Sequence, residues 1–422
     1  MNEPLASLDE ALERMLEGLR PLPAEEVEVE AAAGRVLARP LEARVAMPPW
    51  DNTAMDGFAV RSADVAAATG QAPVRLRVIG EVAAGHAPTV RLEPGTAVRV
   101  LTGAMLPEGA DAVVPVEETD ARAGAAALPE TVQILARAAP GQHVRREGSD
   151  FRAGDALLPA GARVSPAGLA LLAAAGHGTL DVHALPRVAV LATGDELVAP
   201  GASLGPGQIH DSNSPALAAQ ARAVGADVRR LGVARDTEWE VETALRGALE
   251  WADVVVVSGG VSVGSRDVVK GVFERLGRVD LWRVAVQPGK PLAFGHAPAP
   301  GGRDVLLFGL PGNPVSSFVT FELFVRPILR ALGGQRDPTA RRVVRARLAE
   351  PVTKAPRRRA FLRVTLSADP ERAGGLLARS AGGQGSHVLS ALVAADGLAV
   401  IPEDADALPA GAEVDVWQLE GA

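Results

Sequence analysis

The sequence predicts a multidomain α/β and β protein. We expect a central doubly wound α/β domain with a β-rich insertion domain, an elongated N-terminal linker domain and a C-terminal β-barrel. Three observations lead to this prediction. The 422 residues exceed what one ordinary core accommodates, the middle of the chain alternates strand and helix patterns, and short β-like alternations flank it on both sides. The expected domains are residues 1–45 with 147–186 (linker), 46–146 (insertion), 187–333 (α/β) and 334–422 (barrel).

Composition argues against several classes of protein. The formal net charge of -8 disfavours nucleic-acid binding as the main activity. Cysteine is absent, which excludes disulfides, thiolate nucleophiles and cysteine-ligated metals. No apolar run reaches the ~18 residues needed to cross a bilayer, and the start of the chain lacks the pattern of a secretory signal. We therefore expect a cytoplasmic protein that works without a membrane or a nucleic acid.

The first half of the chain predicts one helix, a β-rich region and a second helix. Apolar residues recur at helical spacing over residues 7–20, where Ser7 and Glu10 form a capping-box pattern. Short apolar alternations separated by glycine and proline predict strands over residues 60–146. A second helix is expected at residues 165–177, before the pattern changes.

The second half predicts an α/β domain followed by a β domain. Residues 187–333 alternate strands and helices with continuous valine and leucine runs, which is typical of a largely parallel sheet covered on both faces. Residues 334–422 return to β-like alternation without a long helix. A small C-terminal β-barrel or sandwich is the expected structure.

Four unusual loops follow predicted strands of the α/β region: TGDEL (193–197), SGGVSVGSRDVVK (258–270), QPGKP (287–291) and LPGNPVS (310–316). The carboxyl ends of the strands in an open α/β sheet form the ligand crevice, so we expect the loops to share one site. The glycines after Ser258 and the start of a helix near Asp267 favour a bound anion such as phosphate. No Walker or GxGxxG motif is present, which disfavours ordinary ATPases and dinucleotide-dependent dehydrogenases.

Three carboxylates in these loops suit a divalent cation. Asp195, Glu196 and Asp267 offer hard oxygen ligands of the kind that hold Mg²⁺ against a substrate phosphate. Helix N-capping is the alternative for Asp195 and Asp267. Their coincidence with loops that favour phosphate supports the metal.

Prolines stiffen the last two loops and present Lys290, Asn313 and Ser316 with little conformational freedom. Only three of the 43 basic residues are lysines: Lys270, Lys290 and Lys354. A lysine kept in such a chain suggests a need for a compact ammonium, with chance as the alternative. For Asn313, capping of the following helix is the favoured interpretation.

An arginine-rich stretch and the histidines are less specific signals. Most of Arg357, Arg358, Arg359 and Arg363 are expected on a solvated face, and one or two are expected to close over the anion site from the C-terminal domain. The seven histidines show no metal-ligand spacing, and we expect no catalytic role for them.

Seven segments together resemble one family. They are DNTAMDGFAVR (51–61), LTGAMLPEGADAVV (101–114), RREGSD (145–150), TGDEL, SGGVSVG, QPGKP and LPGNPVS. In this order, over almost the full chain, they resemble the molybdopterin molybdenumtransferases, which include bacterial enzymes and the E domain of gephyrin. The resemblance implies an elongated homodimer of four-domain subunits that uses molybdopterin-AMP and molybdate, with Mg²⁺, and releases AMP and molybdenum cofactor. It also suggests the molybdopterin adenylyltransferase and molybdoenzyme acceptors as partners.

The resemblance further implies site residues. Asp56 and Thr102 would enter the crevice from the partner subunit and act with Glu196, Asp267 and Lys290, and Glu196 and Asp267 would hold Mg²⁺. The implied substrate-binding residues are Asp150, Thr193, Gly194, Asp195, Ser258, Gly259, Gly260, Pro311, Asn313, Ser316 and Arg359. Gln287 and Val268 depart from the family, which often has lysine and tyrosine there, so Gln287 removes one positive charge from the expected molybdate site.

Two other functions stay open at this point. The α/β region also resembles the smaller proteins that adenylylate molybdopterin, so adenylyl transfer is the enzymatic alternative, and the extra β domains favour metal insertion over it. A non-catalytic peptide-binding scaffold, a role that the E domain of gephyrin also has, is the second alternative. The lack of a long linker or an extra targeting domain disfavours it.

Overall fold

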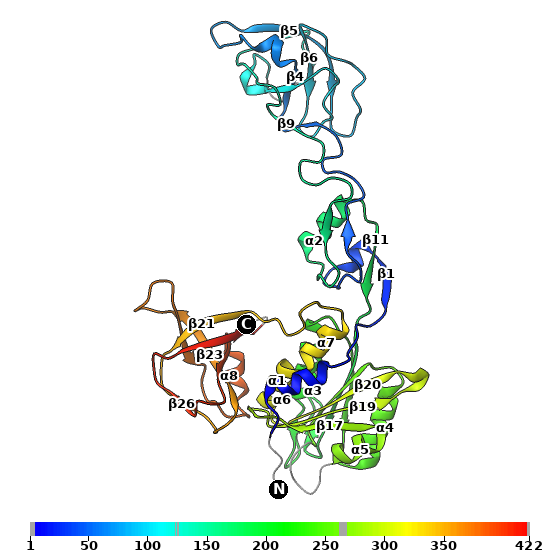
Figure 1. The fold of residues 1–422 in the computed structure, drawn as a ribbon, viewed down its shortest axis with the longest axis vertical. Helices are drawn as coiled ribbons and strands as arrows, with labels where there is room; N and C mark the ends of the chain where they lie inside the picture. Colours follow the sequence, from blue (N-terminus) through cyan, green and yellow to red (C-terminus); the bar gives the residue numbers. More distant parts are fainter. Residues whose placement is uncertain (1–4, 123, 125, 261–267, 420–422) are drawn as a thin grey trace.

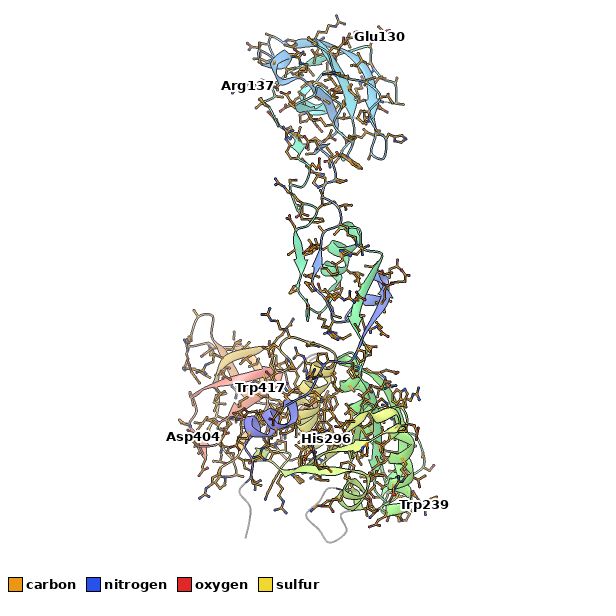
Figure 2. The ribbon with its side chains drawn as sticks, turned by 45° about the vertical axis from the view of Figure 1, so that its right-hand side comes forward. Glu130, Arg137, Trp239, His296, Asp404 and Trp417 are labelled. Carbon is orange, nitrogen blue, oxygen red and sulfur yellow. The ribbon has the colours of Figure 1, made fainter. Side chains whose placement is uncertain are left out.

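The computed structural model describes residues 5–122, 124, 126–260 and 268–419. The molecule is elongated, with the insertion domain at one end, the linker domain in the middle, and the α/β domain beside the C-terminal barrel at the other end (Figure 1). Figure 2 shows Glu130 and Arg137 on the insertion domain, far from Trp239 and His296 of the α/β domain. The expected multidomain α/β and β architecture is confirmed.

The linker domain is built from two short antiparallel pairs and a helix. The strand β1 (Ala24–Glu28) pairs with β11 (Thr179–His183), and β2 (Leu41–Glu42) pairs with β10 (Ala156–Leu158). The helix α2 (Pro166–Ala174) is capped by Ser165, whose hydroxyl accepts the Gly168 N–H at 3.0 Å. The elongated shape of this domain separates the insertion domain from the rest of the chain.

The opening helix packs outside the linker domain. The helix α1 (Leu8–Leu16) has the expected capping box between Ser7 and Glu10. Its apolar face is buried in the core of the α/β domain with the helix α7 (Arg326–Leu332), although residues 1–45 were assigned to the linker domain. The periodicity of α1 shows that it has an apolar face, and only the tertiary structure shows which core covers that face.

The insertion domain carries a five-stranded sheet of order β7-β4-β6-β5-β8. Its strands are β4 (Gly57–Val60), β5 (Val74–Val82), β6 (Thr96–Val100), β7 (Ala112–Pro115) and β8 (Thr131–Ile134). A short pair, β3 (Asn52–Thr53) with β9 (Val144–Arg145), lies between this sheet and the linker domain.

The α/β domain has a six-stranded sheet of order β15-β12-β16-β20-β19-β17. Its strands are β12 (Arg187–Thr193), β15 (Asp227–Ala234), β16 (Val254–Ser258), β17 (Arg278–Arg283), β19 (Pro291–Pro298) and β20 (Asp304–Leu310). The first four in spatial order are parallel. Residues of β12 and β16 point alternately into two cores, one with α3 (Asn213–Ala223), α6 (Pro314–Thr320) and α7 (Arg326–Leu332), the other with α4 (Glu238–Leu249) and α5 (Val268–Leu276). The doubly wound arrangement is confirmed.

One expected strand divides into two. A strand was expected directly before the QPGKP loop, but β17 ends at Arg283 and runs antiparallel to β19. The segment that follows leaves the sheet, and β18 (Val286–Gln287) pairs with the barrel strand β23 (Arg359–Ala368). The QPGKP loop therefore joins the two domains.

The C-terminal domain is a closed barrel. The strands β23, β24 (Leu376–Ser380), β21 (Val343–Leu348), β27 (Glu413–Gln418) and β25 (Gly397–Ile401) pair in that order, and β25 pairs back with β23. This last pairing selects a barrel over a sandwich. A short helix, α8 (Leu389–Val393), faces the α/β domain next to α6. Among the described residues, no helix is long and apolar enough to cross a membrane.

Candidate active site

A polar cavity of about 610 Å³ lies where β12, β16 and β20 end. Three of the four loops line it, through Thr193 and Glu196, through residues 258–260, and through residues 311–313. The fourth loop contributes Pro291. The lining is completed by Leu197, Ile209, His210, Asp211, Ser212, Asn213, Asp236, Pro314 and His387. The strand ends therefore bring together most of the residues expected to bind substrate.

Two glycines let the loop after β16 pack against the end of β12. A Cβ atom on Gly259 (φ +99°) would lie 2.3 Å from the Thr193 carbonyl oxygen, and one on Gly260 (φ +64°) would lie 2.5 Å from a methyl group of Val269. Both backbone conformations favour glycine. Among the described residues, the buried Thr193 hydroxyl has no hydrogen-bond partner, so it remains available to a ligand.

We expect Gly259→Ala to destabilise the fold by about 1–3 kcal/mol and to distort the cavity, because the added methyl group meets backbone at a positive φ. Gly247→Ala is the matched control, since Gly247 lies inside α4 with nothing within 4 Å of an added Cβ. Alanine there should stabilise by ~1 kcal/mol or less. Urea unfolding of both variants checks the prediction, and equal stabilities would contradict the close approach at Gly259.

Asn213 connects the loops and was missed by the sequence analysis. Its side-chain amide donates to the Ser258 hydroxyl at 2.8 Å and to the Gly312 carbonyl oxygen at 2.7 Å. The Ser258 hydroxyl also lies 3.3 Å from the Ser317 hydroxyl. Since Asn213 is the first residue of α3, these bonds fix that helix to two loops of the site. The polar run before Pro215 was the signal that the sequence offered.

Asn313 does not make the expected cap. It occupies the N-cap position of α6, but its side chain makes no cap hydrogen bond and instead lines the cavity. An N-cap side chain at this position would accept a free N–H of the first helical turn, such as that of Val315. Here the Val315 N–H instead donates to the Ser386 carbonyl oxygen of the barrel at 3.0 Å. Ser316 is buried in the first turn of α6 and does not line the cavity.

Three carboxylates meet at one side of the cavity: Asp195, Glu196 and Asp236. The Asp236 N–H donates to Asp195 Oδ1 at 3.2 Å. No helix begins at Asp195, because β13 (Leu197–Val198) follows it, so the N-cap alternative for Asp195 is wrong. Asp236 follows the carboxyl end of β15, and the strand-end rule applied to that strand would have found it. Asp267 lies outside the described residues.

Asp195 and Glu196 act electrostatically on Asp236. Partial burial and then the negative charges of Asp195 and Glu196 raise the pKa of Asp236 above its usual 3.8. The folded protein therefore holds this proton more tightly than the unfolded chain does. The protonated form of Asp236 therefore adds to the free energy of unfolding. This contribution is fully present below about pH 3.8, and it is lost as the pH rises through the raised pKa of the folded protein.

We expect Asp236→Asn to raise the unfolding temperature at pH 7, because it removes one of three repelling charges, and to have little effect below pH 3.8, where Asp236 is protonated in both states. Differential scanning fluorimetry across pH checks this. A variant less stable than wild type at pH 7 would show that the Asp236 carboxylate makes a favourable contact that outweighs the repulsion.

Arg359, the arginine expected to bind substrate, is engaged elsewhere. Its guanidinium forms a two-pronged pair with Asp9, at 3.0 and 2.8 Å, and a second with Glu403, at 3.0 and 2.9 Å. These carboxylates raise its pKa above the usual range, with the Asp9 hydrogen bonds as the largest cause. In this structure Arg359 joins α1 to the barrel.

Arg363 is the buried arginine of the arginine-rich stretch, and it is not among the residues that line the cavity. It is 1% exposed, and among the described residues no carboxylate pairs with it. Its Nη2 donates to the carbonyl oxygens of Gly383 and Gly385 at 2.9 and 3.1 Å. Burial lowers the pKa of this guanidinium. The 383–387 loop that holds it ends at His387, which lines the cavity.

Lys290 lies between two structural units. It precedes the cavity-lining Pro291, and its carbonyl oxygen accepts the Val284 N–H at 3.2 Å. Within the described part of the chain, no carboxylate pairs with its ammonium, whereas Lys270 pairs with Glu274 at 3.7 Å. Gln287, which stands where a lysine is often found, accepts the Ala355 N–H at 2.8 Å and so ties the loop to the barrel.

Asp56 and Thr102 lie together, but far from the cavity. The Thr102 N–H and hydroxyl both donate to Asp56 Oδ1 at 2.7 Å, and these bonds lower the pKa of Asp56. Both residues belong to the insertion domain, at the opposite end of the molecule from the α/β domain (Figure 1). Asp150 is exposed beside β9, near the base of the same domain.

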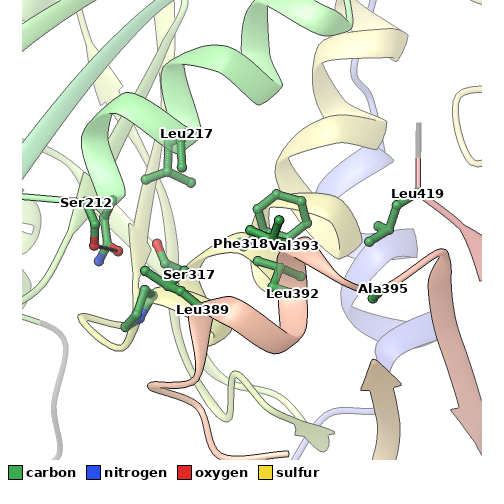
Figure 3. Close-up of a pocket in the computed structure, with 12 residues that line it drawn as sticks. Ser212, Leu217, Ser317, Phe318, Leu389, Leu392, Val393, Ala395 and Leu419 are labelled. Carbon is green, nitrogen blue, oxygen red and sulfur yellow. Dashed lines mark hydrogen bonds between the residues drawn. The ribbon is translucent and has the colours of Figure 1, made fainter. Parts of the chain in front are cut away.

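An apolar groove of about 410 Å³ adjoins the polar cavity and shares Ser212, Asn213 and Pro314 with it. The groove lies between α3, α6 and α8, so the α/β domain and the barrel form opposite walls (Figure 3). Its apolar lining consists of Ala216, Leu217, Phe318, Leu389, Leu392, Val393, Ala395 and Leu419. The crevice therefore has a polar part and an apolar extension.

The fold and the site define a class of protein: a four-part chain whose α/β domain carries a polar crevice at its strand ends, beside a small β-barrel. Models of known families match the same parts. The MoeA N-terminal region (domain I and II) matches residues 6–176, a probable molybdopterin binding domain matches residues 189–331, and the MoeA C-terminal region (domain IV) matches residues 345–419.

Full-length relatives agree with these matches. Molybdopterin molybdenumtransferase 2 of Mycobacterium tuberculosis is 40% identical over 96% of both chains. The molybdopterin molybdenumtransferase of Haemophilus influenzae is 35% identical over 98% of both. A crystal structure of the molybdopterin biosynthesis MoeA protein from Pyrococcus horikoshii covers 99% of this chain and 100% of its own, at 36% identity and a TM-score of 0.79. The chain belongs to the molybdopterin molybdenumtransferase family.

Proposed function

We propose that this protein inserts molybdate into adenylylated molybdopterin and releases AMP, which forms molybdenum cofactor. The observation that carries the proposal is the crevice itself. Loops that favour phosphate, after β12, β16 and β20, meet there. Two cations without a carboxylate partner among the described residues lie next to its lining: Lys290 precedes Pro291, and Arg363 is held by the loop that ends at His387. A nucleotide phosphate and a second, small oxyanion can therefore bind next to each other.

The acids on the other side of the cavity suit a magnesium ion that bridges to substrate. In the described ranges, no group of three acidic or histidine side chains could hold a metal ion. Mg²⁺ commonly binds one or two protein carboxylates and completes its shell with water and substrate phosphates. We propose Glu196 and Asp267 as its ligands, with Asp195 and Asp236 near Glu196. Bound there, Mg²⁺ would withdraw charge from the phosphoanhydride that joins molybdopterin to AMP.

Cations on the barrel side are proposed to bind molybdate. Lys290 offers a compact charge on a loop that Gln287 ties to the barrel, and Arg363 offers a buried guanidinium. Residues of the α/β loops, including Thr193, Ser258 and Asn313, would hold the adenylylated pterin. Together these groups would place molybdate beside the dithiolene while the anhydride is cleaved and AMP leaves.

We also propose that the working form is a homodimer. Asp56 and Thr102 form a polar pair with an ionised carboxylate, but the linker domain holds them far from the crevice of their own chain. A second copy would allow the insertion domain, residues 46–146, to reach the crevice of its partner. Sedimentation at micromolar concentration checks this, and a fully active monomer would contradict it.

Mass spectrometry of ligands that copurify with the protein tests the proposed function. Pterin or AMP bound to the purified protein would support the enzyme. The scaffold alternative predicts neither ligand and tight binding of a peptide. Adenylyl transfer, the other alternative, would be seen as formation of molybdopterin-AMP from ATP and molybdopterin. The barrel that supplies Arg363 favours metal insertion, since adenylyl transfer requires no second oxyanion site.

A further inference from the structure

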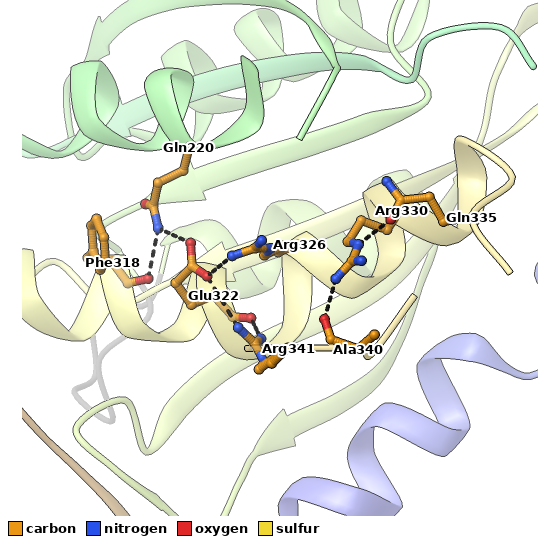
Figure 4. A network of polar contacts seen from close by, with 8 residues as sticks. All are labelled: Gln220, Phe318, Glu322, Arg326, Arg330, Gln335, Ala340 and Arg341. Atoms are coloured by element: carbon orange, nitrogen blue, oxygen red, sulfur yellow. Dashed lines mark hydrogen bonds and ion pairs between the residues drawn. The ribbon is translucent and has the colours of Figure 1, made fainter. Parts of the chain in front are cut away.

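A buried cluster of charges surrounds one turn of the helix that follows the Asn313 loop (Figure 4). Between α6 and α7 the helix contains one π-helical turn, Phe321–Val325, which carries Glu322. The side chains of Glu322 and Arg326 are each 8% exposed, and that of Arg341 is 12% exposed. Burial of three charges is a weak source of stability, and π-helical turns often mark functional positions. The cluster therefore invites a functional explanation.

One carboxylate holds three separate segments. Glu322 Oε1 accepts the Gln220 side-chain amide of α3 at 2.9 Å. Its Oε2 accepts Arg326 Nη1 at 2.8 Å and Arg341 Nη1 at 3.3 Å, and its backbone oxygen accepts a second N–H from Arg341. Gln220 also donates to the Phe318 carbonyl oxygen. The α3 helix, the α6–α7 helix and the connection to the barrel thus meet at Glu322.

The cluster reaches the barrel through Arg341. The Arg341 guanidinium lies over the ring of Trp417 in β27, 4.5 Å from its centroid. Trp417 in turn contacts Phe361 at 5.1 Å between ring centroids, and Phe361 lies two residues before Arg363 in β23. Arg341 therefore touches the wall of the barrel from which Arg363 projects.

A second attachment joins the barrel to the same helix. The Val315 N–H, at the start of α6, donates to the Ser386 carbonyl oxygen at 3.0 Å. Ser386 lies in the 383–387 loop, which holds Arg363 and ends at the cavity-lining His387. The barrel is thus fixed at two points on one continuous helix. Other contacts also join the two domains, including the pairing of β18 with β23 and the ion pair of Arg359 with Asp9.

We propose that Glu322 and Arg341 are positioning residues, which set the angle of the barrel over the crevice and so place Arg363 and the 383–387 loop against a bound oxyanion. The identity of the oxyanion as molybdate rests on the proposed function. The residues themselves lie outside the crevice and touch no substrate. Loss of the Arg341 contact should remove one of the two attachments of the barrel to this helix and loosen the angle between them, and misplacement of a binding group by about 1 Å is costly for recognition.

Arg341→Met is the variant that tests the proposal. It keeps the length of the side chain and a contact with Trp417, and it leaves Glu322 paired with Arg326. Hydrogen exchange at the Val315 amide should become faster, because the bond to Ser386 loosens. Isothermal titration with sodium molybdate should give a dissociation constant raised about tenfold or more. Titration with AMP should stay within about twofold of wild type, since the loops after β12 and β16 are held by contacts within the α/β domain.

Arg303→Met is the matched control. Arg303 is another partly buried arginine, bonded to the carbonyl oxygens of Leu249, Glu250 and Ala252, but it precedes β20 on the side away from the crevice. It should change neither Val315 exchange nor molybdate binding. If Arg341→Met does not fold, Arg341→Lys is tested in the same way. Lysine retains the charge but cannot make both hydrogen bonds that the arginine makes to Glu322.

The outcomes separate this inference from the proposed function. Faster Val315 exchange with weaker molybdate binding, AMP binding intact and a silent control, supports the positioning role. A folded variant with wild-type exchange and wild-type molybdate binding overturns it. Loss of molybdate and AMP binding together would mean that the cluster only supports the fold, and would also overturn it. If the wild-type protein binds no molybdate, the proposed function fails. In that case the positioning role is judged by hydrogen exchange alone, and unchanged exchange at Val315 in Arg341→Met contradicts it.

Discussion

Replacement of Lys290 by alanine should reduce molybdate-dependent formation of molybdenum cofactor by about 100-fold, the usual effect of removing one donor to a transition-state anion. Lys290→Arg should also reduce it strongly. A rotatable ammonium meets a compact oxyanion as a point charge, whereas a guanidinium brings a larger planar group into a loop stiffened by proline. The site depends on this charge all the more because Gln287 carries none and bonds to Ala355.

The measurement is conversion of molybdopterin-AMP at several limiting molybdate concentrations, together with thermal unfolding. Lys270→Ala is a matched control, since Lys270 is partly exposed on α5 and pairs with Glu274. Unfolding should change little in all three variants, because no carboxylate among the described residues pairs with Lys290. Normal conversion by Lys290→Arg at low molybdate would show that Lys290 is an ordinary surface cation.

Asp56→Ala should abolish most activity in the homodimer, and Glu196→Gln should do the same from the other side of a shared site. A mixture of the two variants, dissociated and reassociated, should recover about a quarter of wild-type activity. Random pairing makes half of the dimers mixed, and each mixed dimer has one intact site out of two. The recovery is expected because Asp56 and the crevice of one chain lie far apart.

The control for this experiment is each variant dissociated and reassociated alone, which should stay inactive. Unfolding of Asp56→Ala should change only modestly, because the lost bonds from Thr102 lie at an exposed position. Failure of the mixture to recover activity, while mixed dimers are demonstrated by mass spectrometry, would contradict a site shared between subunits.

The sequence predicted those parts of the fold that follow from local pattern. Continuous apolar runs in β12 and β16 predicted a sheet covered on both faces, and two cores lie there. Strand ends predicted one crevice, since the carboxyl ends of parallel strands meet at one edge. The same rule was not applied to β15, and Asp236 was missed for that reason.

Features that depend on tertiary contacts could not be predicted in this way. Arg359 and Arg363 occupy the same stretch of sequence, yet Arg359 pairs with Asp9 from the far end of the chain, which leaves Arg363 as the arginine without a described carboxylate partner. Asn313 looked like a helix cap, but Ser386 of the barrel accepts the Val315 N–H instead. Each outcome depends on a partner more than 70 residues away in the sequence: Asp9 for Arg359, and Ser386 for Val315.

The central claim is that this crevice exchanges adenylate for molybdenum. Its most direct test supplies the purified protein with molybdopterin-AMP, Mg²⁺ and molybdate, and measures AMP together with the cofactor that activates a molybdenum-free acceptor enzyme. We predict AMP release in step with cofactor formation, with both dependent on Mg²⁺ and molybdate. Formation of molybdopterin-AMP from ATP without any cofactor, or the absence of AMP release under all conditions, would contradict the account.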